Sequence, residues 1–183
     1  AGDVSGKGAM DGMSKALKKD KLDPFALLAA EGVDKSDKIA LMEAMNNLEK
    51  MALIWEGNDP EESRTYTYRE LQAEVQRAAN ALKALGIGKG DRVCIYMQMI
   101  PELSIAMLAC ARIGAVHSIV FGAFSADSLV TRINDSECKA IITQDTGVRG
   151  TKLDIPMKAN ADLAVQSTPS VEKILVVKRT GSE

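Results

Sequence analysis

The sequence predicts an α/β fold, a doubly wound and mostly parallel sheet with helices on both faces, preceded by an N-terminal helical extension. Four short apolar segments, VCIYM, HSIVF, AIIT and ILVV, alternate with helical patterns at a spacing of roughly 25 residues. Parallel strands read as continuous apolar runs because helices cover both faces of their sheet. The 183 residues are 46% hydrophobic, which is enough for a sizeable core. We therefore divide the chain into a helical extension of unknown role, residues 1–50, and an α/β region, residues 51–183.

Two helical patterns make up the extension, after a glycine-rich start at residues 1–9 that we expect to be flexible. The break between the two patterns is Asp23-Pro24, and either Asp34 or Ser36 is suited to cap the second helix. The apolar positions are Met10, Met13 and Leu17, then Leu41, Met45 and Leu48. The methionines suit either a pliable docking surface or a helix that packs on its own domain.

A β-hairpin that leads into a helix is predicted next. Strand-forming residues begin at Ala52 in ALIWEG, turn at NDP and resume at Thr65 in TYTY. Thr67, followed three residues later by Glu70, forms the pattern of a capping box, and Gly86 ends the helix. The apolar stripe of this helix consists of Leu71, Val75, Ala78, Leu82 and Leu85.

A β-α-β crossover occupies the centre of the chain. The preceding segment, GIGKG from Gly86, follows a helix and precedes a strand, so we interpret it as a helix-to-strand turn and not as a phosphate loop. After a strand from Arg92 to Met97, Pro101 is predicted to open a helix that ends at Gly114. The segment HSIVF is then expected to be a buried strand.

The alternation continues towards the C-terminus. Ser125 is the expected cap of the next helix. A strand from Lys139 to Thr143 follows, and a loop from Asp145 to Lys152 comes after it. Pro156 is expected to open a weak helix, and Lys173 to Val177 to form the last strand.

Composition argues against several classes of function. The 23 Lys and Arg residues are balanced by 25 acids without any basic block, so we expect neither nucleic acid nor an anionic membrane as a partner. The start AGDVSGKGAMDG has no apolar leader segment, and the charge-free run from Leu103 to Ala111 is far shorter than the ~20 residues of a membrane span. Cys94, Cys110 and Cys138 lie in or beside apolar segments without C-x-x-C spacing. These features predict a cytoplasmic protein with reduced, structural thiols.

No catalytic constellation is visible in the pattern. The single histidine, His117, lies in a segment predicted to be a buried strand, and no G-x-S-x-G elbow is present. We therefore interpret His117 as a packed core residue. The acidic cluster of Asp59, Glu61 and Glu62 fits a solvated turn better than a metal site. The residues thus predict no catalytic group and no metal site.

Two loops at the carboxyl ends of predicted strands are candidate ligand sites, because ligands bind at that edge of open α/β sheets. In the loop from Phe121 to Ser125, backbone amides and a helix N-terminus can face an anion or a nucleotide ring, with Gly122 permitting close approach. In the loop after the next strand, Arg149 and Lys152 can clamp a phosphate, although two isolated basic residues also occur simply as solvated side chains.

A family resemblance is carried by the segments WEG, GDRV, IYM, MIPEL, AMLACARIGA, VFG, FSA and VVKRTG. In these segments the chain resembles the N-terminal part of the AMP-forming acetyl-CoA synthetases (acetate-CoA ligases) of the adenylate-forming superfamily, over about residues 50–182. The resemblance implies that acetate attacks the α-phosphate of Mg-ATP to give acetyl-adenylate and pyrophosphate. The thiol of coenzyme A then displaces AMP. It also implies that residues 51–183 are a partial N-terminal subdomain of such an enzyme.

A coenzyme A site is implied by the same resemblance. In the family, the coenzyme A nucleotide lies against an F-G-G-F-S loop, and basic residues of a G-V-R-x-x-R segment hold its 3′-phosphate. The corresponding residues here are Phe121, Gly122, Ala123, Arg149, Gly150, Thr151 and Lys152. Ala123 replaces the usual second glycine, which adds a methyl and argues against a positive φ. Lys152 replaces an arginine and loses its planar fork, so we expect weakened binding.

Several motifs of the family do not occur in these 183 residues. The glycine-rich loop that cradles the ATP phosphates and the C-terminal lysine are both lacking, so we expect ATP and Mg²⁺ to act only in the parent enzyme and this chain to be inactive alone. The alternative is a stand-alone module, derived from that enzyme, that binds coenzyme A or another nucleotide, or a protein. The sequence leaves acetate and propionate open as substrates. A truncated sheet exposes apolar faces, so we also expect self-association.

Overall fold

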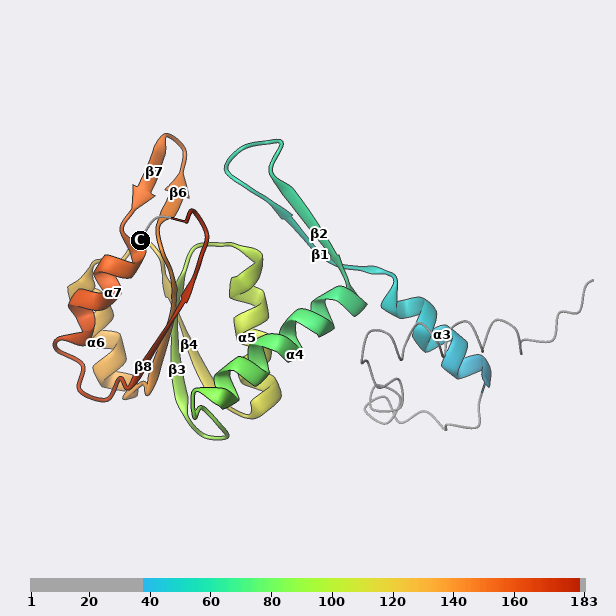
Figure 1. Cartoon of the computed structure of the whole chain (residues 1–183), viewed down its shortest axis with the longest axis horizontal. Coiled ribbons are helices and arrows are strands. Elements are labelled where there is room, and N and C mark those ends of the chain that lie inside the picture. Colours follow the sequence, from blue (N-terminus) through green and yellow to red (C-terminus); the bar gives the residue numbers. More distant parts are fainter. Residues whose placement is uncertain (1–37, 182–183) are drawn as a thin grey trace, which may run out of the picture.

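The predicted α/β architecture is confirmed by the computed structural model, which describes residues 38–181 (Figure 1). The helices are α3 (Lys38–Leu48), α4 (Tyr68–Ala84), α5 (Pro101–Ile113), α6 (Ala126–Ser136) and α7 (Met157–Val165). The strands are β1 (Met51–Glu56), β2 (Ser63–Thr67), β3 (Arg92–Met97), β4 (Val116–Phe121), β5 (Ala140–Gln144), β6 (Gly147–Arg149), β7 (Lys152–Ile155) and β8 (Lys173–Val177). The predictions for Met10, Met13, Leu17, Asp34 and Ser36 lie outside the described residues.

Four parallel strands form the central sheet, in the order β4-β3-β5-β8. Helices α4 and α5 cover one face, and α6 and α7 cover the other (Figure 1). The residues of β3 alternate between two cores, with Val93, Ile95 and Met97 on the α4/α5 side and Cys94 and Tyr96 on the α6/α7 side. The predicted arrangement of a parallel sheet between two helical layers is therefore correct.

Strand β4 differs from its prediction as a buried strand, because it lies at an edge of the sheet and, in the part of the chain that the structure describes, pairs only with β3. Val116, Ile119 and Phe121 are 58%, 46% and 56% exposed. His117 is half-buried, so its interpretation as a packed core residue is wrong. An apolar run indicates a strand, but it does not indicate whether a second strand will pair with it.

The local signals for helix ends are confirmed. Thr67 and Glu70 form both hydrogen bonds of the capping box at the start of α4. Pro101 opens α5, and Gly114 ends it with a φ of +74°. Ser125 caps α6 by accepting a hydrogen bond from a backbone N–H of the first turn. These features depend on neighbours within a few residues, which is why a pattern of residues predicts them.

The segment from Asp145 to Lys152, predicted as a loop, contains part of an antiparallel hairpin of β6 and β7. Gly150 occupies the first position of its two-residue turn with a φ of +58°. Glycine takes that conformation without the steric penalty of a Cβ atom. The predicted hairpin of β1 and β2 is also present, and both hairpins project from the same end of the molecule (Figure 1).

Helix α3 contacts α4, and its residues Met45 and Leu48 are buried. Glu49, directly after α3, forms an ion pair with Arg69 of α4 at 2.6 Å. The choice between a docking surface and packing for the methionines of the extension stays a prediction, because Met10 and Met13 lie outside the described residues. The division of the chain at residue 50 stays a prediction.

All three cysteines are buried, as predicted for structural thiols. Burial raises the pKa of the Cys94 thiol to about 12 and that of Cys110 to about 11, because the interior disfavours a thiolate. They are therefore unreactive core side chains. Within residues 38–181 there is no helix of the length and apolar character needed to cross a membrane.

Candidate functional site

The two candidate loops lie at the same edge of the sheet, because β4, β3, β5 and β8 are parallel and end together. The loop after β4 carries Phe121 to Ser125, and the β6–β7 hairpin follows β5. The connection from β3 runs towards β4 and that from β5 towards β8, so the strand order reverses between β3 and β5. Ligands of open α/β sheets bind outside such a switch point.

Tyr96 of β3 anchors the loop after β4 by a hydrogen bond. The Tyr96 hydroxyl donates to the Phe124 carbonyl at 2.8 Å and accepts from Asn160 Nδ2 of α7 at 3.2 Å. Gly122 is buried, and a Cβ there would lie 2.9 Å from Met157 Cε. The protein itself therefore packs closely around this glycine, whereas the sequence suggested close approach of a ligand.

Ala123 does not strain the loop. Among the described residues only Glu137 combines a side chain with a positive φ, so Ala123 has a backbone conformation that any residue adopts. Its methyl group is exposed. The expected conflict between this alanine and the backbone is absent, and the departure from glycine leaves the fold of the loop intact.

An aromatic surface lies beside Ala123. Phe121 is 56% exposed and meets Phe124 edge to face, with ring centroids 6.1 Å apart. The guanidinium of Arg132 from α6 lies 4.5 Å from the centroid of Phe124. Exposed aromatic rings and arginine planes are surfaces on which nucleotide bases stack. Arg132 was missed from the sequence because it lies on a helix, away from either loop.

The hairpin presents two cations. Arg149 and Lys152 are Cα partners across β6 and β7, and both are exposed. Neither forms an ion pair within the described residues. Two adjacent cations without an acidic partner are suited to a phosphate. Gly150 and Thr151 form the turn between them.

A pair of glutamines at the switch point anchors the base of this hairpin. Gln98 Oε1 accepts from Val148 N–H at 2.8 Å, and Gln98 N–H donates to Gln144 Oε1 at 2.9 Å. A Cβ at Gly147 would lie 2.6 Å from the Gln98 amide, so a larger residue there would displace this amide from its hydrogen bonds. The two glutamines thus join the end of β3 to the end of β5 and to the base of the hairpin.

Asp145 holds the segment that follows β8 in place by hydrogen bonds. Its carboxylate, 5% exposed as a residue, accepts backbone N–H bonds from Thr146, Arg179, Thr180 and Gly181 at 2.7–3.2 Å. Burial raises the pKa of this carboxyl, but the backbone donors outweigh burial and hold it below its usual value. Asp145 is therefore an ionised structural clamp and not a free ligand for a substrate.

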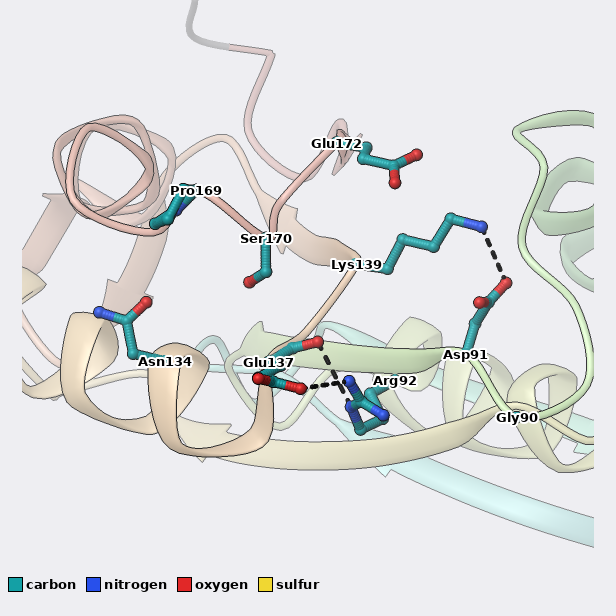
Figure 2. A pocket seen from close by; sticks show the side chains of 9 residues that line it. All are labelled: Gly90, Asp91, Arg92, Asn134, Glu137, Lys139, Pro169, Ser170 and Glu172. Carbon is teal, nitrogen blue, oxygen red and sulfur yellow. Dashed lines mark hydrogen bonds and ion pairs between the residues drawn. The ribbon is translucent and has the colours of Figure 1, made fainter.

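A hollow of about 450 Å³ lies at the opposite edge, among the amino ends of the strands (Figure 2). In Figure 2, Lys139 faces Asp91 and Arg92 faces Glu137, at 3.1 and 2.9 Å. These four side chains form ion pairs with one another. Open α/β sheets bind their ligands at the carboxyl ends of the strands, which is the opposite edge from this hollow. We assign no ligand to this hollow. Within residues 38–181 no three His, Cys, Asp or Glu residues are grouped as metal ligands.

Comparison with known proteins supports the resemblance seen in the sequence. The model of a family described as AMP-binding enzyme matches residues 42–183. An acetyl-coenzyme A synthetase of Rubrobacter xylanophilus is 64% identical over 135 residues, which are 74% of this chain and 21% of that protein. Acetyl-coenzyme A synthetase 2 of Pseudomonas putida is 58% identical over 135 residues, with the same shares. An acetyl-coenzyme A synthetase of Nostoc linckia is 56% identical over 133 residues, 73% of this chain and 39% of that protein. The chain thus spans about a fifth of the length of the first two relatives.

Proposed function

This chain belongs to the family of AMP-binding enzymes, and from that premise we propose that it is part of an AMP-forming acetyl-CoA synthetase and supplies part of its coenzyme A site. The observation that carries the proposal is the pair of cations, Arg149 and Lys152, which form no ion pair within residues 38–181 and lie on a hairpin at the ligand-binding edge of the sheet. The exposed ring of Phe121 lies at the same edge, as the second element of the site.

In this proposal the hairpin binds the 3′-phosphate of coenzyme A and the loop after β4 binds its nucleotide. Arg149 supplies a planar fork for two phosphate oxygens, and Lys152 supplies a point charge. The turn residues Gly150 and Thr151 bring the two cations together. Gly122 and Ala123 shape the loop, and Phe121 offers a ring to the adenine.

The reaction of the whole enzyme requires more than this chain contains. Acetate, ATP and coenzyme A would give acetyl-CoA, AMP and pyrophosphate through acetyl-adenylate, with Mg²⁺ on the ATP phosphates. The 183 residues contain no glycine-rich loop for those phosphates, and we assign them no catalytic residue and no metal ligand. We therefore propose that the chain alone is inactive, acts with small-molecule substrates within a cytoplasmic enzyme, and needs the remaining regions of its relatives for catalysis.

The test compares Arg149→Ala with the unaltered chain by calorimetry, using coenzyme A and dephospho-coenzyme A. A charge-assisted bond to phosphate contributes about 1.5–3 kcal/mol, so we expect roughly a tenfold or greater loss for coenzyme A and little change for the dephospho form. Lys152→Arg restores a planar fork and is expected to tighten binding of coenzyme A. Arg112→Ala, which removes an exposed arginine at the far end of α5, is the control. Equal losses for both ligands contradict the assignment of Arg149.

We also propose that the isolated chain self-associates through its open strand edges. Val116, Ile119 and Phe121 are exposed along β4, and Val176 of β8 is 36% exposed. Exposed apolar edge strands pair with other chains. Light scattering after size exclusion should show dimers or larger species, and Ile119→Lys should shift them towards the monomer. A monomer at all concentrations contradicts this proposal.

A further inference from the structure

The β1–β2 hairpin contacts three segments at the ligand-binding edge, each of which follows a different strand of the central sheet. Trp55 Nε1 donates to the Met99 carbonyl after β3 at 2.7 Å. Glu62, predicted as part of a solvated turn, pairs with Arg179 after β8 at 2.7 Å. The third contact, from Asn58, reaches the tip of the β6–β7 hairpin. These contacts join a segment near the start of the described residues to the edge that carries the candidate site.

Asn58 holds Gly150 by two hydrogen bonds. Its Nδ2 donates to the Gly150 carbonyl at 3.0 Å, and its Oδ1 accepts from the Gly150 N–H. A side-chain amide has one donor group and one acceptor, so it matches both polar groups of a single backbone residue. The two residues are 92 positions apart in the sequence.

The contact with Asn58 matters for the candidate phosphate site because of where Gly150 lies in the hairpin. Gly150 lies between Arg149 and Lys152 in the turn of a short hairpin, and an isolated two-stranded hairpin is marginally stable in water. The base of the hairpin is anchored by Gln98, through the Val148 N–H. Asn58 anchors the tip, so the backbone on both sides of Arg149 is held, and the turn that leads to Lys152 starts from a fixed residue.

We propose that Asn58 is a positioning residue of the coenzyme A phosphate site, which fixes the spacing of Arg149 and Lys152 before the ligand arrives. The inference rests on the proposed function. Holding the hairpin in its bound conformation lowers the entropy that binding must overcome. A proline at position 60 and the hydrogen bond from Glu61 N–H to Asp59 Oδ1 order the turn that presents Asn58.

The experiment measures the ratio of affinities for coenzyme A and dephospho-coenzyme A in the full 183-residue chain. Asn58→Ala removes both hydrogen bonds, and we expect this ratio to fall about 3- to 10-fold, as the loss of one or two hydrogen bonds predicts. Asn58→Asp keeps an acceptor for the Gly150 N–H but turns a carboxylate oxygen towards the Gly150 carbonyl, so we expect a loss at least as large as in Asn58→Ala. Glu61→Ala, in the same exposed turn, is the control and should leave the ratio unchanged.

Hydrogen exchange of the Gly150 amide gives a second readout. It should accelerate in Asn58→Ala while the amides of β3 and β5 stay protected, which separates loss of the tip contact from global unfolding. If the unaltered chain does not distinguish the two ligands, the proposed function fails and the role of Asn58 fails with it. If the unaltered chain distinguishes them and Asn58→Ala does so equally well, only the role of Asn58 is overturned.

Discussion

The clamp formed by Asp145 is expected to contribute a large share of the stability of this domain. In Asp145→Asn, one carboxylate oxygen becomes an NH₂ group, which cannot accept a hydrogen bond. Oδ2 accepts from Gly181 N–H at 2.7 Å, while Oδ1 accepts from Thr146 and Arg179 N–H at 2.8 and 2.9 Å. Whichever orientation the amide takes, at least one backbone N–H faces another donor.

The magnitude follows from the number and kind of bonds lost. A hydrogen bond to a charged group contributes about 1.5–3 kcal/mol, and the remaining bonds weaken when the charge disappears, so we expect Asp145→Asn to cost about 3 kcal/mol. For a chain of this size that corresponds to a fall in Tm of about 6–12 °C. Circular dichroism during thermal and urea unfolding measures it, with Asp154→Asn, an exposed residue of β7, as control.

The pH dependence of this effect has a defined sign. Because the folded-state pKa of Asp145 lies below its unfolded value, the stability it contributes is fully present above the unfolded pKa of about 4. That stability is lost as the pH falls through the folded-state pKa. The stability difference between the unaltered chain and Asp145→Asn should therefore shrink between pH 6 and pH 3. A loss no larger than that of Asp154→Asn, or a difference independent of pH, would refute the clamp.

Further predictions concern the same edge and the core. Gly147→Ala places a methyl group against the anchored Gln98 amide and should cost about 1–3 kcal/mol of unfolding free energy, whereas Gly88→Ala, where the added methyl meets open space, should be nearly neutral. Tyr96→Phe leaves its amide donor and carbonyl acceptor without a partner and should cost about 1–3 kcal/mol, with the exposed Tyr68→Phe as control; equal melting curves would contradict this. The three buried thiols should resist an aromatic disulfide reagent at pH 8 until urea unfolds the chain, and rapid labelling of the native protein would contradict their burial.

Much of the fold was predictable because its signals are local. The capping box of Thr67 and Glu70, Pro101 at the start of α5 and Gly114 at its end depend on the few residues around them. The apolar strand segments and the direction of their connections also follow from pattern, since right-handed crossovers join parallel strands. The candidate cations Arg149 and Lys152 came from a motif within one short segment.

The features that the sequence did not predict depend on which distant segments pair with each strand in the folded chain. His117 and the other residues of β4 have the sequence of a buried strand, but no strand pairs with their outer edge in the described residues. The hairpin of β6 and β7 was predicted as a loop because its order comes from Gln98, about fifty positions earlier in the chain. Neither propensity nor periodicity contains information about such a partner.

The sequence by itself determined the α/β class, the helix ends, the buried cysteines and the family to which the chain belongs. Only the tertiary structure determined that β4 is an edge strand, that Asp145 binds the segment after β8, and that Asn58 binds Gly150. The physical reason is the range of the interactions. Capping, turn and burial preferences act over a few residues, whereas the hydrogen bonds that fix the candidate site join segments that only the packed sheet brings together.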